Sequence, residues 1–236
     1  MSTLMLPGQA AAPEGPIDLS MMYVLHHGFR RDLARFVDAA RLTPVTDTAT
    51  WPALLQRWDL FAMLLHDHHH KEDDHVWPLL RRAAAGDVAG LAVLDEMEEE
   101  HDTIDPLLDA VRDRLVRMVD APDLPTRQAL ERLVAGAREH LDQHLGHEEL
   151  EAIALIQQYV APSDWDHLDR TALRGGLGPR DLLKMIPWAV EGLPAEVTAE
   201  LLREVPPFRL FLLVGRRRFA RLEAAAFRHV RAEAGA

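Results

Sequence analysis

Four long stretches of helical periodicity, separated by short breaks, constrain the fold of this chain more than any other feature. They cover about residues 17–42, 50–85, 87–119 and 126–159. Signals for β-strands are weak throughout, because β-branched runs are few and apolar and polar residues rarely alternate. Because the breaks are short, neighbouring helices should run antiparallel. The sequence therefore predicts an all-α protein whose residues 17–160 form an up-down-up-down four-helix bundle.

Capping residues and prolines indicate where these helices begin, end and bend. Thr50 suits an N-cap, Pro52 suits the first helical turn, and Gly86 suits the position just after a helix. Pro78 and Pro106 fall inside the second and third helical stretches. Since proline removes a backbone donor and clashes with the preceding turn, we expect a kink at each.

The two ends of the chain differ from the bundle. Residues 1–16 lack a basic start followed by an apolar core, so we expect a flexible leader rather than a signal peptide. After "APSDW" at 161–165, glycines and prolines divide the chain into shorter expected helices near 163–172, 179–190, 195–204 and 207–231. We predict that this helical C-terminal extension, residues 161–236, packs on the bundle. Its stretch "LLKMIPWAVEGLP" is interpreted as a lid over one end or, preferably, as additional core.

Charge and histidine are distributed unevenly along the chain. The formal net charge is −12 and cysteine is absent. Residues from Pro162 onward carry 12 basic and 10 acidic side chains, which leaves −14 on residues 1–161, and eleven of the thirteen histidines precede residue 150. Without cysteine there are no disulfides, iron–sulfur clusters or thiolate ligands. The acidic, histidine-rich part is therefore expected to bind metal through nitrogen and oxygen.

The net charge and the lengths of the apolar runs restrict the possible partners and the location of the protein. A strongly acidic chain lacks the basic surface that binding to nucleic acid requires, so we expect no nucleic-acid partner. No apolar run approaches the roughly 18–20 residues that span a bilayer, so we expect no transmembrane segment and a cytoplasmic protein. Whether the chain has a protein partner is not determined by the sequence.

Two H-x-x-x-E motifs place a histidine and a glutamate on one buried helix face. His68 and Glu72 form such a pair in "LHDHHHKEDDHVWP", because residues four apart project in the same direction from a helix. His144 and Glu148 repeat the arrangement in the fourth helix. Either pair alone is often just a local polar pair. His66 and His70 are expected to face water.

The first and third helices each direct one more histidine to the core. His26 shares an apolar stripe with Phe29, and His101 shares one with Met97. A single core-facing histidine is usually just hydrogen-bonded. Four imidazoles and two carboxylates buried together, however, would incur a heavy desolvation penalty and like-charge repulsion without a cation. We therefore predict two metal ions in the core, as in di-iron and di-manganese carboxylate bundles.

The segments "LHHGFRRDL", "HHHKEDDHVWPLL", "EEEHDTIDPLL" and "HLGHEELEAI" resemble the hemerythrin-like, or HHE cation-binding, domain family. The resemblance covers about residues 17–160, with Pro78 at the position of the family's usual proline. It implies six metal ligands: His26, His68, Glu72, His101, His144 and Glu148. In the invertebrate oxygen carriers of this family the third helix supplies two histidines in H-x-x-x-H, whereas this chain has Met97 four residues before His101. His140, His75 and His69 are reserve candidates for a fifth nitrogen. His27, His69, His70 and His147 are expected to lie around the ligands or in solvent.

The resemblance also implies that the two metal ions are iron, although the ligand types alone would accept manganese or zinc. Three uses of such a centre stay open. The first is binding of a small oxidant (dioxygen, nitric oxide or peroxide) by a carrier or sensor, with Phe29, Leu65, Met97 and Leu145 as apolar lining. The second is a di-iron oxidase or oxygenase, or a peroxide or nitric oxide reductase, acting on a substrate covered by the extension. The third is iron storage or iron sensing. No phosphate loop, dinucleotide fingerprint or nucleophile motif appears, so no catalytic residues distinct from the metal ligands are expected.

Overall fold

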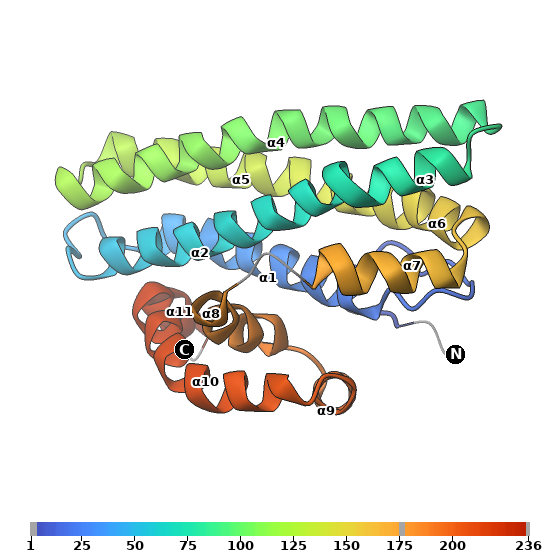
Figure 1. The fold of residues 1–236 in the computed structure, drawn as a ribbon. Helices are drawn as coiled ribbons and strands as arrows, with labels where there is room; N and C mark the ends of the chain where they lie inside the picture. The colour runs from blue at the N-terminus through green and yellow to red at the C-terminus, as the bar shows by residue number, and fades with distance from the viewer. Residues whose placement is uncertain (1–3, 175–177, 235–236) are drawn as a thin grey trace.

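The computed structural model describes residues 4–174 and 178–234, and these residues form helices and connecting segments without a β-strand. Figure 1 shows the four long helical stretches lying side by side. The first is α1 (Ser20–Leu42) and the third is α4 (Val88–Asp120). The second and fourth are each interrupted by a π-helical segment. The second consists of α2 (Thr50–Lys71), η1 (Glu72–Val76) and α3 (Trp77–Ala83). The fourth consists of α5 (Leu124–His147), η2 (Glu148–Ala152) and α6 (Ile153–Tyr159). The prediction of an all-α helical bundle is confirmed.

Aspartates cap the starts of three of these helices. The side chains of Asp87 and Asp123 accept hydrogen bonds from the backbone N–H groups of Gly90 and Thr126, at 3.0 and 2.6 Å. Such caps satisfy amides that have no partner within the helix and contribute about 1 kcal/mol each. The cap of α2 differs from the prediction. Thr50 is itself helical, and the carboxylate of Asp47 accepts from its backbone N–H at 3.1 Å.

The core of the bundle consists of large apolar side chains at helical spacing. Those with an exposed fraction of 0% include Phe29, Leu33, Trp58, Phe61, Leu65, Leu94, Met97, Val111, Leu145 and Ile153. Each buried side chain of this size contributes about 1.5–3 kcal/mol relative to an exposed one. The two predicted kink sites differ from each other. Pro106 lies within the continuous helix α4, and Pro78 lies in the first turn of α3, directly after η1.

The N-terminal leader requires a correction. Residues 1–16 were expected to be flexible, and residues 1–3 of that range lie outside the described residues. The part from residue 4 onward packs on the bundle: Leu6 is buried, and the backbone N–H of Ala10 donates to Glu149 Oε2 at 2.6 Å. Ile17 exchanges two hydrogen bonds with the side chain of Gln157, at 3.0 and 2.8 Å. An apolar anchor and long-range hydrogen bonds therefore hold the leader in place.

The C-terminal extension lies along the side of the bundle (Figure 1). It comprises α7 (Pro162–Leu168), η3 (Asp169–Leu173), α8 (Pro179–Val190), α9 (Ala195–Glu204), α10 (Pro207–Ala226) and α11 (Arg228–Ala234). α8 and α10 cross closely, because a Cβ on Gly215 would lie 2.1 Å from the carbonyl oxygen of Leu183. α8 and α11 contact α1, while α10 contacts α2. The stretch "LLKMIPWAVEGLP" thus lies mostly in α8 against the side of α1, with Trp188 fully buried.

None of the helices among the described residues combines the length and the hydropathy needed to cross a bilayer.

Candidate metal centre

Two groups of buried side chains converge in the core of the bundle. The first consists of His26, His68, Glu72 and Glu148, and the second of His69, His101 and His144. Within each group the potential ligand atoms lie within 4.8 Å of one another. All seven side chains are buried, and they come from all four long helical stretches. This arrangement brings five imidazoles and two carboxylates into one small volume.

Glu72 connects the two groups. Its Oε1 atom lies 3.2 Å from Nε2 of His68 in the first group, and its Oε2 atom lies 3.6 Å from Nε2 of His101 in the second. One carboxylate oxygen therefore faces each group. A carboxylate with this orientation is suited to contact two cations at once.

In the second group, hydrogen bonds determine which ring nitrogen of His101 and of His144 carries the proton. Nδ1 of His101 lies 2.8 Å from Asp73 Oδ1, and Nδ1 of His144 lies 2.7 Å from Glu100 Oε2. Because the carboxylates accept, each Nδ1 is the donor, and each neutral ring keeps a lone pair on Nε2. The two Nε2 atoms are 3.2 Å apart. Two nitrogens bound to one ion at about 2.1 Å would be separated by roughly 3.0–3.4 Å, so the pair fits a shared cation.

The first group has the same kind of support on His26. Its Nδ1 atom lies 2.8 Å from Glu149 Oε1, and its Nε2 atom lies 3.2 Å from Glu148 Oε2. Arg30 donates to both oxygens of Glu149, at 2.6 and 3.0 Å, and so holds that carboxylate in place. A histidine that ligates a metal commonly donates its other ring nitrogen to a carboxylate in this way.

Buried polar atoms without a hydrogen-bond partner are concentrated at this centre. Among the described residues they include Nε2 of His26 and His68, both ring nitrogens of His69, and both carboxylate oxygens of Glu72 and Glu148. Leaving so many polar atoms buried and unpaired would cost several kcal/mol. Nearly all of them are lone-pair donors pointing into one volume, so the residues fit bound cations.

A family model supports this interpretation. The model described as hemerythrin HHE cation binding domain matches residues 18–156, which is more than half of the chain. The chain belongs to the hemerythrin HHE cation-binding domain family. The matched range contains all seven converging side chains, while the C-terminal extension lies outside it. Comparisons with curated proteins and with solved structures found no match.

Electrostatics in the hemerythrin domain favours neutral imidazoles in the centre of the site. Burial lowers the pKa of His68 and His69 well below the ordinary value, and neighbouring imidazoles lower it further. Burial would also lower the pKa of His26, but the carboxylates of Glu148 and Glu149 outweigh it and raise that pKa to about 9. His68 and His69 therefore keep their lone pairs at neutral pH.

The two glutamates respond in opposite directions. Burial, reinforced by the charge of Glu148, raises the pKa of Glu72 well above its ordinary value. Burial would likewise raise the pKa of Glu148, but His26, followed by His68, lowers it to about 2. Without a cation, then, Glu72 retains a proton while Glu148 pairs with His26. A bound metal ion would replace the proton on Glu72 and the proton that His26 shares with Glu148.

The two π-helical segments of the bundle, η1 and η2, each begin at a glutamate of an H-x-x-x-E motif. The backbone N–H of Glu72 points to the carbonyl oxygens of His68 and His69, and that of Glu148 points to those of His144 and Leu145. Pro78 follows η1, but no proline follows η2 within its helix, so proline is not the shared cause. Single π turns occur frequently at functional sites. Here they place each glutamate beside the histidines of the preceding turn.

The hemerythrin domain brings together His26, His68, Glu72, His101, His144 and Glu148, the six ligands that the sequence implied. It adds His69, which was a reserve candidate. The other two reserve candidates require a correction. His75 is exposed, and His140 is exposed with its Nδ1 atom 2.9 Å from the carbonyl oxygen of Gly136. Both side chains point away from the core, so neither belongs to the two groups.

The remaining histidines lie around the centre or in solvent. His66 and His70 are exposed and pack against each other, with ring centroids 4.0 Å apart. His147 is half-buried and lies 2.9 Å from Glu100, and His27 is half-buried next to the leader and Gly192.

Sequence reasoning did not identify the supporting carboxylates Asp73, Glu100 and Glu149. Each directly precedes or follows a proposed ligand in the chain. That adjacency is a usable signal, because such residues lie at the edge of the buried face. It does not distinguish them from Asp102, which directly follows His101.

Proposed function

We propose that this protein is a non-haem di-iron protein that binds a small oxidant (dioxygen, nitric oxide or peroxide) as a carrier or sensor. The observation that carries the proposal is the convergence of five imidazoles and two carboxylates, with unpaired lone pairs, in the core. His26, His68 and Glu148 would hold one ion, His69, His101 and His144 the other, and Glu72 would contact both. Iron is preferred because of the family, although manganese or zinc would accept the same ligands.

The number of donor atoms supports binding of an external ligand. Five imidazole nitrogens and four carboxylate oxygens make nine donors, fewer than the about twelve that two octahedral ions require. The surrounding side chains Phe29, Leu65, Met97 and Leu145 are all fully buried and exclude water from the centre. Bound ferrous ions would supply the electrons with which an oxidant is bound or reduced.

The chain's own residues would hold the ligands in position. Glu149, Asp73 and Glu100 accept the Nδ1 protons of His26, His101 and His144 respectively. This bonding keeps each Nε2 free and each ring oriented toward the centre. Arg30 and the backbone N–H of Ala10 in turn fix Glu149.

The alternative function is that of a di-iron oxidase or oxygenase, or of a peroxide or nitric oxide reductase, whose substrate lies under the extension. The extension covers the side of α1 and α2, which is the feature that favours an enzyme. A surface groove of about 480 Å³ lies between α1 and α5, but none of its lining residues is a proposed ligand. We therefore prefer a small ligand over a large substrate.

Iron storage or sensing is the third function, and it predicts metal content that varies with supply. We propose the cytoplasm as the location.

Metal analysis combined with optical spectra tests the proposal. The full chain is loaded with ferrous iron under anaerobic conditions, and its spectrum is recorded before and after adding dioxygen, nitric oxide or peroxide. A content of about two ions per chain and a spectral change that reverses on removing the gas support a carrier or sensor. Rapid consumption of oxidant without a reversible change supports the enzyme. A chain that holds no iron at this centre overturns the proposal.

A further inference from the structure

The C-terminal extension reaches the metal centre through three aromatic rings in contact. Trp188 of α8 is fully buried, and its ring centroid lies 5.2 Å from that of Phe29 on α1. The Phe29 centroid in turn lies 5.3 Å from that of His68. A side chain outside the range matched by the hemerythrin family model is therefore separated from a proposed ligand by a single ring.

A glycine in α1 permits this close contact. A Cβ atom on Gly28 would lie 2.7 Å from Cζ2 and 2.8 Å from Cη2 of Trp188. Glycine inside a helix costs about 1 kcal/mol relative to alanine. Its presence between His27 and Phe29 allows the indole to lie directly against the α1 backbone, two residues from His26.

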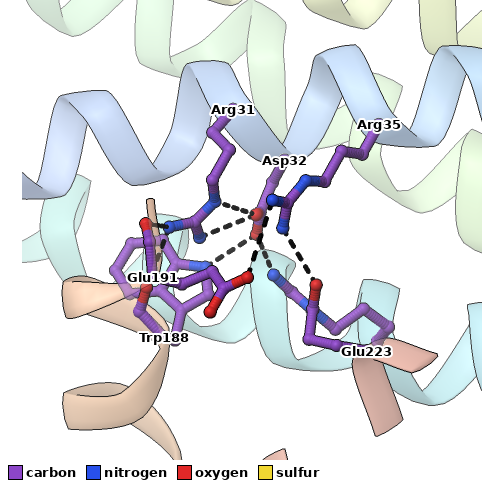
Figure 2. Close-up of polar contacts among 7 residues, drawn as sticks. Arg31, Asp32, Arg35, Trp188, Glu191 and Glu223 are labelled. Atoms are coloured by element: carbon purple, nitrogen blue, oxygen red, sulfur yellow. Dashed lines mark hydrogen bonds and ion pairs between the residues drawn. The ribbon is translucent and has the colours of Figure 1, made fainter. Parts of the chain in front are cut away.

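A buried carboxylate holds the indole in this position. Nε1 of Trp188 donates to Asp32 Oδ2 at 2.7 Å, as Figure 2 shows. The same oxygen accepts from Arg57 Nη2 at 2.6 Å, and Asp32 Oδ1 accepts from Arg31 Nε and Nη2 at 3.0 and 2.8 Å. Arg31 also donates to the carbonyl oxygens of Trp188 and Glu191, at 3.0 and 2.5 Å. Both the side chain and the backbone of Trp188 are thus fixed to α1.

A second buried pair fixes the other part of the extension. Glu223 of α10 accepts from Arg57 of α2. It also accepts from Arg35 of α1 (Figure 2), and these two atoms are 2.9 Å apart. Asp32, Arg57 and Glu223 have exposed fractions of 0–1%, so only well-aligned partners stabilise them. Hydrogen bonds and ion pairs of this network form only in particular directions. They therefore fix how the extension lies on the bundle, and this sets the position of Trp188.

His68, like His69, depends on packing more than the other three proposed histidine ligands do. Nδ1 of His26, His101 and His144 each lies within 2.8 Å of a carboxylate. Among the residues that the structure describes, no carboxylate accepts from Nδ1 of His68. Instead the rings of Phe29 and His26 contact it, each with a centroid separation of 5.3 Å. Where an outer hydrogen bond is missing, packing must fix the ring orientation.

We propose that Trp188 is a positioning residue of the metal centre: held by Asp32, it keeps Phe29 against the His68 imidazole and so fixes the orientation of that ligand. The extension is then a structural part of the centre. This inference rests on the proposed binding of metal, but not on the identity of the oxidant.

The test compares Trp188→Leu with Phe227→Leu in the full chain. Both substitutions remove a buried aromatic ring of the extension that packs on a phenylalanine of α1. Phe227 packs on Phe36, at 5.3 Å, and Phe36 contacts Trp58 and Phe61 rather than a proposed ligand. The two variants therefore both replace a buried ring by leucine and differ in their connection to His68. Trp188→Leu also removes the hydrogen bond to Asp32, and Trp188→Phe separates that loss from the loss of the ring.

Zinc titration against a chromophoric chelator measures affinity, and the absorption of the cobalt-loaded protein reports ligand geometry. We expect Trp188→Leu to lower the affinity for one of the two ions by about tenfold and to change the absorption spectrum of the cobalt-loaded protein. Phe227→Leu should match the unchanged protein in both measurements. Trp188→Phe, which keeps a ring against Phe29, should restore most of the affinity.

A metal-free measurement separates this inference from the proposed function. The imidazole NMR signals of His68, assigned with His68→Gln, should shift and broaden in Trp188→Leu but not in Phe227→Leu. If both variants leave affinity and NMR signals unchanged, or if both alter them equally, Trp188 has no positioning role. If the unchanged protein binds no metal but the NMR response appears, the positioning role stands and the proposed function fails.

Discussion

The Nε2 atoms of His101 and His144 face each other at 3.2 Å, although both rings already donate their Nδ1 protons to carboxylates. Neither Nε2 can donate to the other while both rings are neutral. Burial lowers the pKa of His144, which disfavours an additional proton on that ring. A cation between the two nitrogens removes the conflict. His69 lies beside them, and both of its ring nitrogens are buried without a partner.

His69→Ala should lower the metal content of the protein as much as His101→Ala does. His69 is buried, both of its ring nitrogens lack a partner, and its ring stacks on His101 with centroids 4.0 Å apart. His70→Ala is the matched control, because His70 is the next residue and is exposed. Metal analysis after dialysis checks the result. Full metal content in His69→Ala would remove His69 from the centre.

Metal binding should release protons at neutral and mildly basic pH. In the metal-free protein the pKa of His26 is about 9, because of Glu148 and Glu149, and the pKa of Glu72 is well above its ordinary value. Both groups give up a proton when they bind metal, so the apparent affinity should rise with pH until His26 is deprotonated near pH 9. Calorimetry of metal binding in two buffers of different ionisation enthalpy gives the number of protons released. A binding heat that is the same in both buffers contradicts this expectation.

Glu149→Ala should weaken metal binding by about 10–100-fold, because His26 loses the acceptor that orients it. Glu151→Ala provides the control, since Glu151 lies in the same π segment with an exposed side chain. Chelator competition measures both. Equal affinities in the two variants would show that Glu149 does not support His26. Arg30→Ala should have a smaller effect in the same direction, because Glu149 then keeps the donor from Ala10.

Arg57→Met should destabilise the protein by about 3–5 kcal/mol, because it leaves the buried carboxylates of Asp32 and Glu223 without their shared partner. The surface pair of Arg112 and Asp59 is the comparison, since both side chains are more than 40% exposed. Arg112→Ala should change the free energy of unfolding by less than about 1 kcal/mol. Chemical denaturation measures both variants. Similar values would show that the network with the extension contributes little.

Gly28→Ala and Gly136→Ala should change stability in opposite directions. A methyl group at Gly28 meets the ring of Trp188 at 2.7 Å, so we expect a loss of about 1–3 kcal/mol. A methyl group at Gly136 in α5 has nothing within 4 Å, so we expect a gain of about 0.5–1 kcal/mol from helix propensity. Thermal or chemical unfolding distinguishes the two. A stabilised Gly28→Ala would mean that α8 does not press on α1 in solution.

Most of the fold follows from local signals in the sequence. Helical periodicity, together with breaks such as "DAPDLP", predicted α1, α4 and the stretch from α5 to α6 to within a few residues of their observed ends. The shorter helices of the extension were predicted from glycine and proline positions. The leader could not be predicted in this way, because Ala10 and Ile17 are held by hydrogen bonds to residues 139 and 140 positions later in the chain.

The candidate site was predictable where ligands obey α-helical spacing. His68 with Glu72 and His144 with Glu148 follow that spacing on apolar stripes. His69 could not be assigned to the core from spacing, because it lies about 100° around an α-helix from His68. Only the tertiary arrangement shows that His69 lies against His101 of α4 and His144 of α5. The role of Trp188 depends on a contact across 159 positions of sequence with Phe29, which no local pattern encodes.

The π segments η1 and η2 rotate the apolar face of the helices that contain them. Each inserts the equivalent of one extra residue, so side chains after Glu72 and Glu148 are offset by about 100° from where an uninterrupted α-helix would place them. Trp77 and Leu80, like Ile153 and Ile156, are buried in this shifted register. A helical wheel drawn through either motif therefore misplaces every residue beyond the glutamate. The buried face of each of these helices must therefore be assigned separately before and after the π segment.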